Sequence, residues 1–245
     1  MSSISVNGVQ YNVEIMGSGI PLMCLHGFTG STKTWTRLAE DLHPQFSIIL
    51  LDMLGHGNSS QPSDPSRYSM NHTIADLLEI LDQIEIDKIN LLGYSLGART
   101  ALSFAVQHPE RCMNLILESG SPGIFDSSER MKRVEADEKL AKSIDQHGIE
   151  FFINYWESIP LFQSQMKTSD SARASLRSQR LHNSAVGLAN SLRGIGTGSQ
   201  PPVHDFLPTT PIPTCIIAGE ADARYCHIGK DMAQVIPNRD RKSVV

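Results

Sequence analysis

The chain has 245 residues and a formal net charge of −5 at neutral pH, from 21 Lys and Arg against 26 Asp and Glu. This length fits one large domain, or a core with an inserted cap, and can bury a substantial apolar centre. The acidic balance and the absence of a Lys/Arg run argue against nucleic acid as a partner, and the lack of a bilayer-length apolar run argues against a membrane.

The N-terminal residues read MSSISVNGVQYNVEIM and lack the basic start and apolar stretch of a signal peptide, so we expect a cytoplasmic protein. The four cysteines, Cys24, Cys112, Cys215 and Cys226, have no zinc-type spacing. We therefore expect small buried thiols and no metal site.

Short apolar and β-branched runs bounded by turn residues recur along the chain, which is typical of strands buried on both faces. In chain order they are YNVEI, PLMCLH, FSIILLD, INLLG, LILES and TCIIAG. Helix-like stretches such as STKTWTRLAEDL and TIADLLEILDQI separate most of them. The alternation predicts an α/β fold, with a mostly parallel sheet and helices on both faces.

The strand pattern disappears between residues 121 and 205, where amphipathic helical segments take over. The clearest are FFINYWESIPLF and SLRSQRLHNSAVGLANSLRGIG. We interpret residues 121–205 as a helical cap inserted into a core made of residues 1–120 and 206–245.

The clearest chemical signal is the G-x-S-x-G pattern in LLGYSLGAR, which places Ser95 directly after a strand-like run and before a helix-like one. Gly93 and Gly97 let the chain turn sharply there, so that the serine hydroxyl projects over the sheet edge. The helix that begins behind Ser95 adds partial positive charge where an oxyanion would form. We predict that Ser95 is catalytic.

A second motif, LHGFTG, follows the strand-like run PLMC. The loop after that strand and the residue after the serine supply the backbone N–H groups of an oxyanion hole, which here are those of Phe28 and Leu96. His26 and His56 lie beside tight glycine turns, and a loop-bracing role is favoured over a catalytic one for both.

With a serine at such a strand-to-helix turn, the triad follows in the order serine, acid, histidine. The strand-like run TCIIAG ends in a turn with two acids. We predict that Asp222 is the triad acid, with Glu220 as the fallback. The histidine is expected one helix and one strand later.

These motifs, with DMLGHGNS, LESGSPG, YWESIPLF and GLANSLRGIGTGSQP, resemble one branch of the α/β-hydrolase superfamily over residues 4–238. The branch is the 2-succinyl-6-hydroxy-2,4-cyclohexadiene-1-carboxylate synthases of menaquinone biosynthesis. The resemblance implies a carbon–oxygen lyase that eliminates pyruvate from 2-succinyl-5-enolpyruvyl-6-hydroxy-3-cyclohexene-1-carboxylate. It implies no cofactor, and a triad that acts as a base.

The resemblance also implies site residues beyond Ser95 and Asp222. They are Tyr94 before the serine, the arginines Arg99, Arg133 and Arg177 as ligands of a small polycarboxylate substrate, and the cap aromatic Trp156. Guanidinium groups suit this substrate because they bind carboxylates through two hydrogen bonds. Arg180 lies three residues after Arg177, and the sequence does not choose firmly between them. Surface salt-bridging is the alternative role for each arginine.

The triad histidine of similar proteins has no counterpart here. His227 is the one histidine after Asp222 and lies only five residues on, in a helix-like stretch, so we do not expect it to complete a triad. We expect that the last strand and helix of the fold are missing and that the chain as given is nearly inactive. The final residues, DRKSVV, match one reading frame of a sequencing-library adapter. The alternatives, a natural truncation and an adapter artefact, are decided by the source DNA.

Two other functions compete with this one. An esterase or C–C bond hydrolase would share the serine motif and the oxyanion loop, but neutral esters need no arginine cluster. A catalytically dead anion-binding protein would keep the arginines and have lost the base. The sequence does not indicate an oligomeric state.

Overall fold

The structure is a computed structural model that describes residues 2–237 and 239–244, and it is built on one eight-stranded sheet in the order β1-β2-β4-β3-β5-β6-β7-β8. The strands are β1 Ser2–Val6, β2 Val9–Met16, β3 Ile20–Leu25, β4 Phe46–Leu51, β5 Ile89–Tyr94, β6 Cys112–Glu118, β7 Thr214–Gly219 and β8 Arg239–Val244. β1 and β2 are antiparallel to their neighbours, and all other pairs are parallel. The six strand-like runs all form strands of this sheet.

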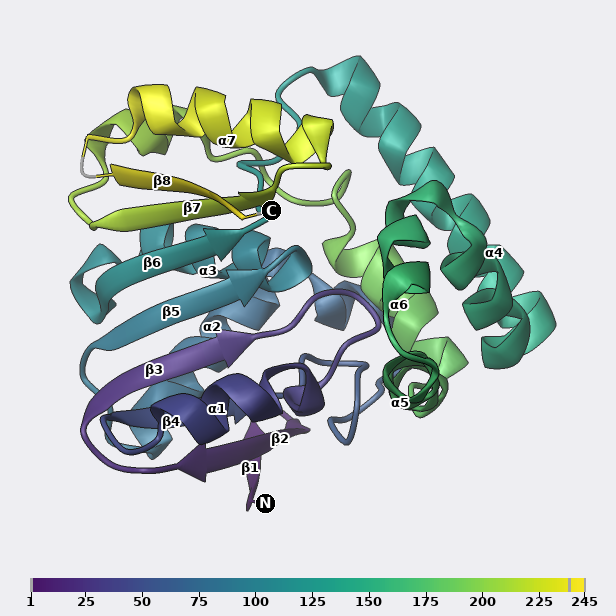
Figure 1. The fold of residues 1–245 in the computed structure, drawn as a ribbon, viewed down its shortest axis with the longest axis horizontal. Coiled ribbons are helices and arrows are strands. Elements are labelled where there is room, and N and C mark those ends of the chain that lie inside the picture. The colour runs from purple at the N-terminus through teal and green to yellow at the C-terminus, as the bar shows by residue number, and fades with distance from the viewer. Residues whose placement is uncertain (1, 238, 245) are drawn as a thin grey trace.

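Helices cover both faces of the sheet, as predicted (Figure 1). The helices of the core are α1 Thr36–Leu42, α2 Met70–Gln83, α3 Leu96–Gln107 and α7 Ala223–Val235. In β3, Met23 and Leu25 join the apolar cluster beneath α2 and α3, whereas Leu22 and Cys24 join the cluster beneath α1. This alternation follows from the two-residue period of a strand, and it explains why the run is apolar throughout.

The segment between β6 and β7 contains helices and no strand. Its elements are α4 Ser127–Ser158, the 3-10 helix η4 Pro160–Lys167, α5 Asp170–Leu181, α6 Ala185–Ile195 and the 3-10 helix η5 His204–Thr209, and α4 is interrupted at Gly148, whose φ is 79°. Figure 1 shows α4, α5 and α6 beside the sheet, next to the end where β3 and β5 finish. We call residues 121–205 the cap, and these boundaries stay a prediction.

The cap has an apolar centre of its own. Ile144, Phe152 and Ile153 of α4 pack against Leu188 and Leu192 of α6 in a cluster separate from the two clusters of the sheet. The cap helices are therefore held together by burial of their own side chains.

The prediction that the last strand is missing is wrong. Residues Arg239–Val244 form β8, which pairs in parallel with β7 from Thr214 opposite Arg239 to Gly219 opposite Val244. Without this pairing β7 would be an edge with unpaired N–H and C=O groups, and an extended segment satisfies them through its backbone whatever its sequence. No helix follows β8 within the described residues, and the origin of residues 240–245 stays a prediction.

Two further expectations concern cysteines and membrane spans. Cys24 and Cys112 are buried, and burial raises the pKa of each thiol to about 12, whereas Cys215 and Cys226 are only partly buried. The prediction of buried thiols therefore holds for the first two alone. Within the described residues, no helix combines the length and the apolar character needed to cross a bilayer.

Candidate active site

Ser95 occupies a sharp turn between β5 and α3. Its φ of 51° lies in the left-handed region, which a residue with a side chain rarely adopts. The Ser95 N–H donates to the carbonyl of Glu118 on β6 at 2.8 Å, and its own carbonyl accepts from the N–H of Arg99 one helical turn later. The turn is therefore tied to the neighbouring strand and to α3, which fixes the strained serine at the carboxyl end of the sheet.

Gly93 and Gly97 make this turn possible. A Cβ on Gly97 would collide with the backbone carbonyl of Leu25, and one on Gly93 would collide with the backbone of Gly97 and Ala98. The predicted need for small residues on both sides of the serine is confirmed, because these backbones touch.

Two backbone N–H groups near Ser95 have no acceptor within the described residues. Leu96 opens α3, so its N–H cannot bond within the helix, and Phe28 lies in the loop after β3. Both residues line the same cavity as Ser95. Their amides are thus available to an anion next to the serine, as an oxyanion hole requires.

His26 braces the loop that carries Phe28. It is fully buried, its Nε2 accepts from the Met53 N–H at 3.0 Å, and its Nδ1 lies 2.8 Å from the Gly27 carbonyl. Burial lowers the pKa of His26 to about 4, so the ring is neutral near pH 7. The bracing role expected from the sequence is confirmed.

His56 packs against His26 with a ring-centroid distance of 5.1 Å, and its Nδ1 lies 3.2 Å from the Leu54 carbonyl. Burial lowers its pKa to about 3. It does not line the cavity, so its role is also structural.

Asp222 lies in the turn between β7 and α7 and caps the N-terminus of α7, where its Oδ1 accepts from the Tyr225 N–H at 3.1 Å. It lines the cavity together with Ser95, whereas Glu220 does not. The structure thus favours Asp222 over the fallback.

The cavity has a volume of about 640 Å³ and lies between the core and the cap. The core contributes the loop after β3, the serine turn and the start of α7, and the cap contributes α4, η4, α5 and α6. The predicted site residues on its wall are Phe28, Tyr94, Ser95, Leu96, Arg99, Arg133, Trp156 and Asp222.

Arg99 is buried in this wall, with 6% of its surface exposed. Its Nη1 donates to the Ile195 carbonyl at 3.0 Å and to Oε1 of Gln200 at 3.1 Å. Burial lowers its pKa to about 10, which leaves it charged near pH 7. Both acceptors are neutral, so the positive charge of Arg99 is not cancelled by an ion pair.

Arg133 and Arg180 face the cavity from the cap. Arg133 Nε pairs with Asp137 at 2.8 Å. Arg180 Nη1 pairs with Glu157 at 3.1 Å, its Nη2 donates to Gln165, and its guanidinium lies 4.9 Å from the centre of the Phe162 ring. The buried Arg180 Nε has no acceptor within the described residues and remains able to bind an oxygen.

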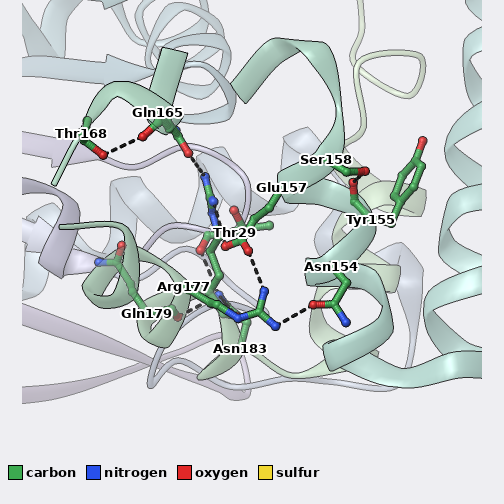
Figure 2. A network of polar contacts seen from close by, with 11 residues as sticks. Thr29, Asn154, Tyr155, Glu157, Ser158, Gln165, Thr168, Arg177, Gln179 and Asn183 are labelled. Carbon is green, nitrogen blue, oxygen red and sulfur yellow. Dashed lines mark hydrogen bonds and ion pairs between the residues drawn. The ribbon is translucent and has the colours of Figure 1, made fainter. Parts of the chain in front are cut away.

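Arg177, by contrast, does not line the cavity. Its guanidinium donates to Glu157 and to Asn154 on α4, both at 2.6 Å, and Figure 2 shows these bonds in the network of polar side chains between α4 and α5. The structure thus brings Arg180 and not Arg177 to the cavity wall, and the role of Arg177 as a substrate ligand stays a prediction. The two residues lie three apart on α5, and small differences in helix rotation decide which one points inward.

Trp156 of the cap forms an aromatic contact with the loop after β3. Its ring meets Phe28 edge-on at 5.4 Å between centroids and contacts Phe152 and Phe162 at the same distance. The buried Trp156 Nε1 has no acceptor within the described residues. It is therefore a donor available to a ligand.

The sequence analysis missed Arg224 and Tyr225, which line the cavity from the first turn of α7. Arg224 is exposed and has no carboxylate partner among the described residues, although a cation at a helix N-terminus is electrostatically unfavourable. Arg224 follows the predicted triad acid Asp222 by two residues, and this closeness in sequence could have indicated that it lines the same cavity. Gln200 was also missed as the partner of Arg99, although it ends the GIGTGSQ stretch.

All nine histidines of the chain lie in the described residues, and none lines the cavity. His227 is exposed on α7, with Nε2 lying 3.4 Å from Asp231, so it does not complete a triad. The described residues also contain no group of three or more His, Cys, Asp or Glu side chains suited to a metal ion.

Comparison with known proteins gives a consistent result. The family described as the alpha/beta hydrolase fold matches residues 20–240. A Bacillus subtilis (strain 168) protein, provisionally named a 2-succinyl-6-hydroxy-2,4-cyclohexadiene-1-carboxylate synthase, is 44% identical over 95% of this chain and 85% of its own length. The protein of that name from Enterobacter sp. (strain 638) is 32% identical over 90% of this chain and 84% of its own length.

Among solved structures, MenH from S. aureus superimposes with a TM-score of 0.90 and 36% identity, covering 96% of this chain and 88% of that one. A thermophilic esterase from Thermogutta terrifontis, with malate bound, gives a TM-score of 0.86 at 25% identity, over 99% of this chain and 87% of that one. The fold is thus shared with esterases, whereas the higher identities belong to the synthases.

Proposed function

Because this chain belongs to the alpha/beta hydrolase family and, within it, to the 2-succinyl-6-hydroxy-2,4-cyclohexadiene-1-carboxylate synthases, we propose that its cavity carries out the reaction these relatives are named for. The substrate is then 2-succinyl-5-enolpyruvyl-6-hydroxy-3-cyclohexene-1-carboxylate. A base removes the ring proton at C2, the electrons of that C–H bond form the C2–C3 double bond, the existing C3–C4 double bond shifts to C4–C5, and the C–O bond at C5 breaks. The enolpyruvate that leaves becomes pyruvate by taking up a proton at its methylene carbon, so the ring loses one proton and the leaving group gains one, and no cofactor takes part.

The observation that carries this proposal is the set of arginines around Ser95. Arg99, Arg133, Arg180 and Arg224 all line a cavity that also holds the serine and Asp222. A neutral ester needs no such set, whereas a substrate with several carboxylates needs a charged partner for each. Arg99 has only neutral partners and Arg224 no carboxylate, so both can bind substrate without breaking an internal ion pair.

We assign the reacting roles to the core and divide the binding roles between the core, which supplies Arg99 and Arg224, and the cap, which supplies Arg133 and Arg180. In a complete triad with Asp222 and a histidine, Ser95 would act on the ring proton, and the amides of Phe28 and Leu96 would stabilise negative charge beside it. Tyr94 and Trp156 line the cavity around the ring. The partner of the site is a small polycarboxylate, and the proposed location of the reaction is the cytoplasm.

The chain as given should perform this reaction slowly. None of its histidines lies on the cavity wall, so no imidazole can accept the Ser95 proton there. Loss of one triad member lowers the rate on the order of 10⁴-fold, and the remaining rate comes from binding and the oxyanion hole. We therefore propose that the 245 residues bind substrate well and turn it over poorly.

Two measurements on the 245-residue chain test these proposals together. Calorimetric titration with 2-succinylbenzoate, an aromatic analogue with two carboxylates, should show binding at one site that Arg99→Gln weakens. Pyruvate release, followed with a coupled dehydrogenase, should be slow but above the rate without protein. Hydrolysis of p-nitrophenyl acetate with no binding of the dicarboxylate would indicate an esterase instead, and tight binding with no release at all would indicate an anion-binding protein.

A further inference from the structure

Asn183 follows His182, the C-cap of α5, and connects the cap to two loops of the core. It is 4% exposed. Its Nδ2 donates to the carbonyl of Thr29 at 2.9 Å and to that of Arg180 at 3.1 Å, and its Oδ1 accepts from the Gly57 N–H at 3.0 Å. Figure 2 shows Asn183 and Thr29 in the same network of polar contacts as Arg177. One amide side chain thus joins three separate segments.

The Thr29 that it holds has an unusual backbone. Its φ is 69°, in the left-handed region, and a β-branched residue there is a true outlier. Such a conformation persists only where the surroundings fix it. The hydrogen bond from Asn183 to the Thr29 carbonyl is a restraint of that kind, and Thr29 itself is 3% exposed.

Thr29 directly follows Phe28, which lines the cavity together with Ser95. The conformation of residue 29 determines how the chain leaves Phe28 and continues to the turn at Gly30, where the Gly30 N–H donates to the Gly27 carbonyl. The direction of the Phe28 N–H is therefore sensitive to whether the peptide after Thr29 is held in place.

The hydrogen bond from the Gly57 N–H to Asn183 Oδ1 ties Asn183 to a second loop of the core, which is itself bonded to the loop of Thr29. Gly57 belongs to the loop after β4, in which Asp52 accepts from the Asn58 N–H at 2.9 Å. The other oxygen of Asp52 accepts from the Thr32 N–H at 2.6 Å, and Thr32 belongs to the same loop as Thr29. Both loops are thus fixed to each other by Asp52 and fixed to the cap by Asn183.

We propose that Asn183 is a positioning residue that holds the strained Thr29 peptide and thereby orients the Phe28 N–H for its role beside Ser95. This inference rests on the proposed function, because it assumes that the Phe28 amide takes part in the reaction. It means that the oxyanion site is complete only when the end of α5 is docked on the core.

The test compares Asn183→Asp with the matched variant Asn190→Asp. Asn190 is 3% exposed, and its Nδ2 likewise binds core carbonyls, those of Pro62 and Ser63, but none in the oxyanion loop. Each variant removes an N–H donor and keeps an acceptor of the same size. The full chain is used throughout.

Hydrogen–deuterium exchange of the peptides that cover residues 27–32 is the first readout. Asn183→Asp is expected to speed exchange there by about tenfold or more, whereas Asn190→Asp leaves these peptides within about twofold of the parent. Asn183→Ser, which introduces no buried charge and cannot span both loops, should give the same local change and serves if the aspartate variant does not fold. Equal exchange of residues 27–32 in the Asn183 and Asn190 variants would overturn the inference.

A double-mutant cycle with Thr29→Gly separates positioning from general stability. Glycine adopts a positive φ without strain, so in that background Asn183→Asp should change exchange at residues 27–32 by less than about threefold. The Asn190 variant should show no such coupling to residue 29, and a missing coupling for Asn183 would contradict the inference.

Pyruvate release gives the second readout. Asn183→Asp should lower kcat by about tenfold with KM nearly unchanged, since the oxyanion donors act mainly on the transition state. If the parent releases no pyruvate while the local exchange still responds to residue 183, the proposed function fails and the positioning stands. If the parent is active and neither kcat nor exchange responds to residue 183, the positioning fails and the function stands.

Discussion

The guanidinium of Arg99 donates a hydrogen bond of 3.1 Å to the side-chain oxygen of Gln200, and both side chains are buried. Arg99 belongs to α3 of the core, whereas Gln200 follows the last long helix of the cap. The Gln200 amide is itself held, because its Nε2 donates to the Ser121 carbonyl at 3.4 Å. The cap thus fixes the orientation of a core arginine, which gives the GIGTGSQ stretch a physical role.

We predict that Gln200→Leu weakens binding of 2-succinylbenzoate by about tenfold, since a hydrogen bond to a charged group contributes about 1.5–3 kcal/mol. The Arg99 charge remains, but its guanidinium loses the acceptor that aligns it. Calorimetric titration measures the change. Gln83→Leu, on the exposed side of α2, is the control and should bind like the parent.

Arg180→Gln and Arg177→Gln should behave differently although the two residues share the partner Glu157. Arg180 lines the cavity, so its loss should raise the dissociation constant of the dicarboxylate by about tenfold. Arg177 is a partly exposed ion-pair partner, and its loss should change affinity by less than about twofold. The reverse order of effects would identify Arg177 as the substrate ligand.

The stability of the fold should fall as the pH drops from about 6.5 to 4. Burial lowers the pKa of His26 to about 4 and that of His56 to about 3, below the value near 6.5 of an unfolded histidine. At a pH between the folded and unfolded pKa values, both histidines are protonated in the unfolded chain and neutral in the folded chain. Protonation therefore stabilises the unfolded state, and a fall in pH lowers the free energy of unfolding. Each histidine contributes on the order of 2 kcal/mol to the loss between pH 7 and 5.

This pH dependence is measured from thermal midpoints at pH 7 and pH 5. His56→Gln, which cannot titrate, should show a smaller decrease than the parent. His43→Gln, at an exposed position after α1, should show the full decrease. An unchanged decrease in the His56 variant would mean that His56 is not the titrating group.

Gly97→Ala should prevent formation of the serine turn, because the added Cβ collides with the backbone carbonyl of Leu25 at the end of β3. We expect a loss of about 3 kcal/mol or more in the free energy of unfolding, as is usual where backbone strain cannot relax. Gly219→Ala, which has open space around the added Cβ, should stay within about 0.5 kcal/mol. Urea titration followed by circular dichroism measures both.

Replacing the residues after Pro237 with the corresponding segment of the Bacillus subtilis relative should raise pyruvate release by about 10³-fold or more, if that segment supplies the triad histidine. The same chimera carrying Ser95→Ala should return to the low rate. A chimera no faster than the parent would show that an imidazole is not what limits the reaction.

Much of the fold followed from the sequence, since apolar runs bounded by turns mark buried strands wherever they occur. The serine turn was also predictable, because a sharp turn leaves no room for a Cβ at Gly93 and Gly97, and both glycines lie within two residues of Ser95 in the sequence. β1 and β8 were not predicted: each is an edge strand, whose pairing depends on the neighbour that it meets more than on its own apolar content.

The cap residues of the site were harder to predict. Arg177 and Arg180 differ only in the rotation of α5, which is set by packing against α4. Asn183 gave no signal at all, because its importance comes from Thr29 and Gly57, more than a hundred positions earlier in the chain.

The paired contacts of Gln200 with Arg99 and of Asn183 with Thr29 have a consequence for protein engineering. Both bonds join a cap side chain to a core residue, so the cap is not an interchangeable module. A cap transplanted from an esterase of the same fold would leave the Arg99 guanidinium and the Thr29 carbonyl without their partners. Changing the selectivity of this scaffold would therefore require redesign of both sides of the junction together.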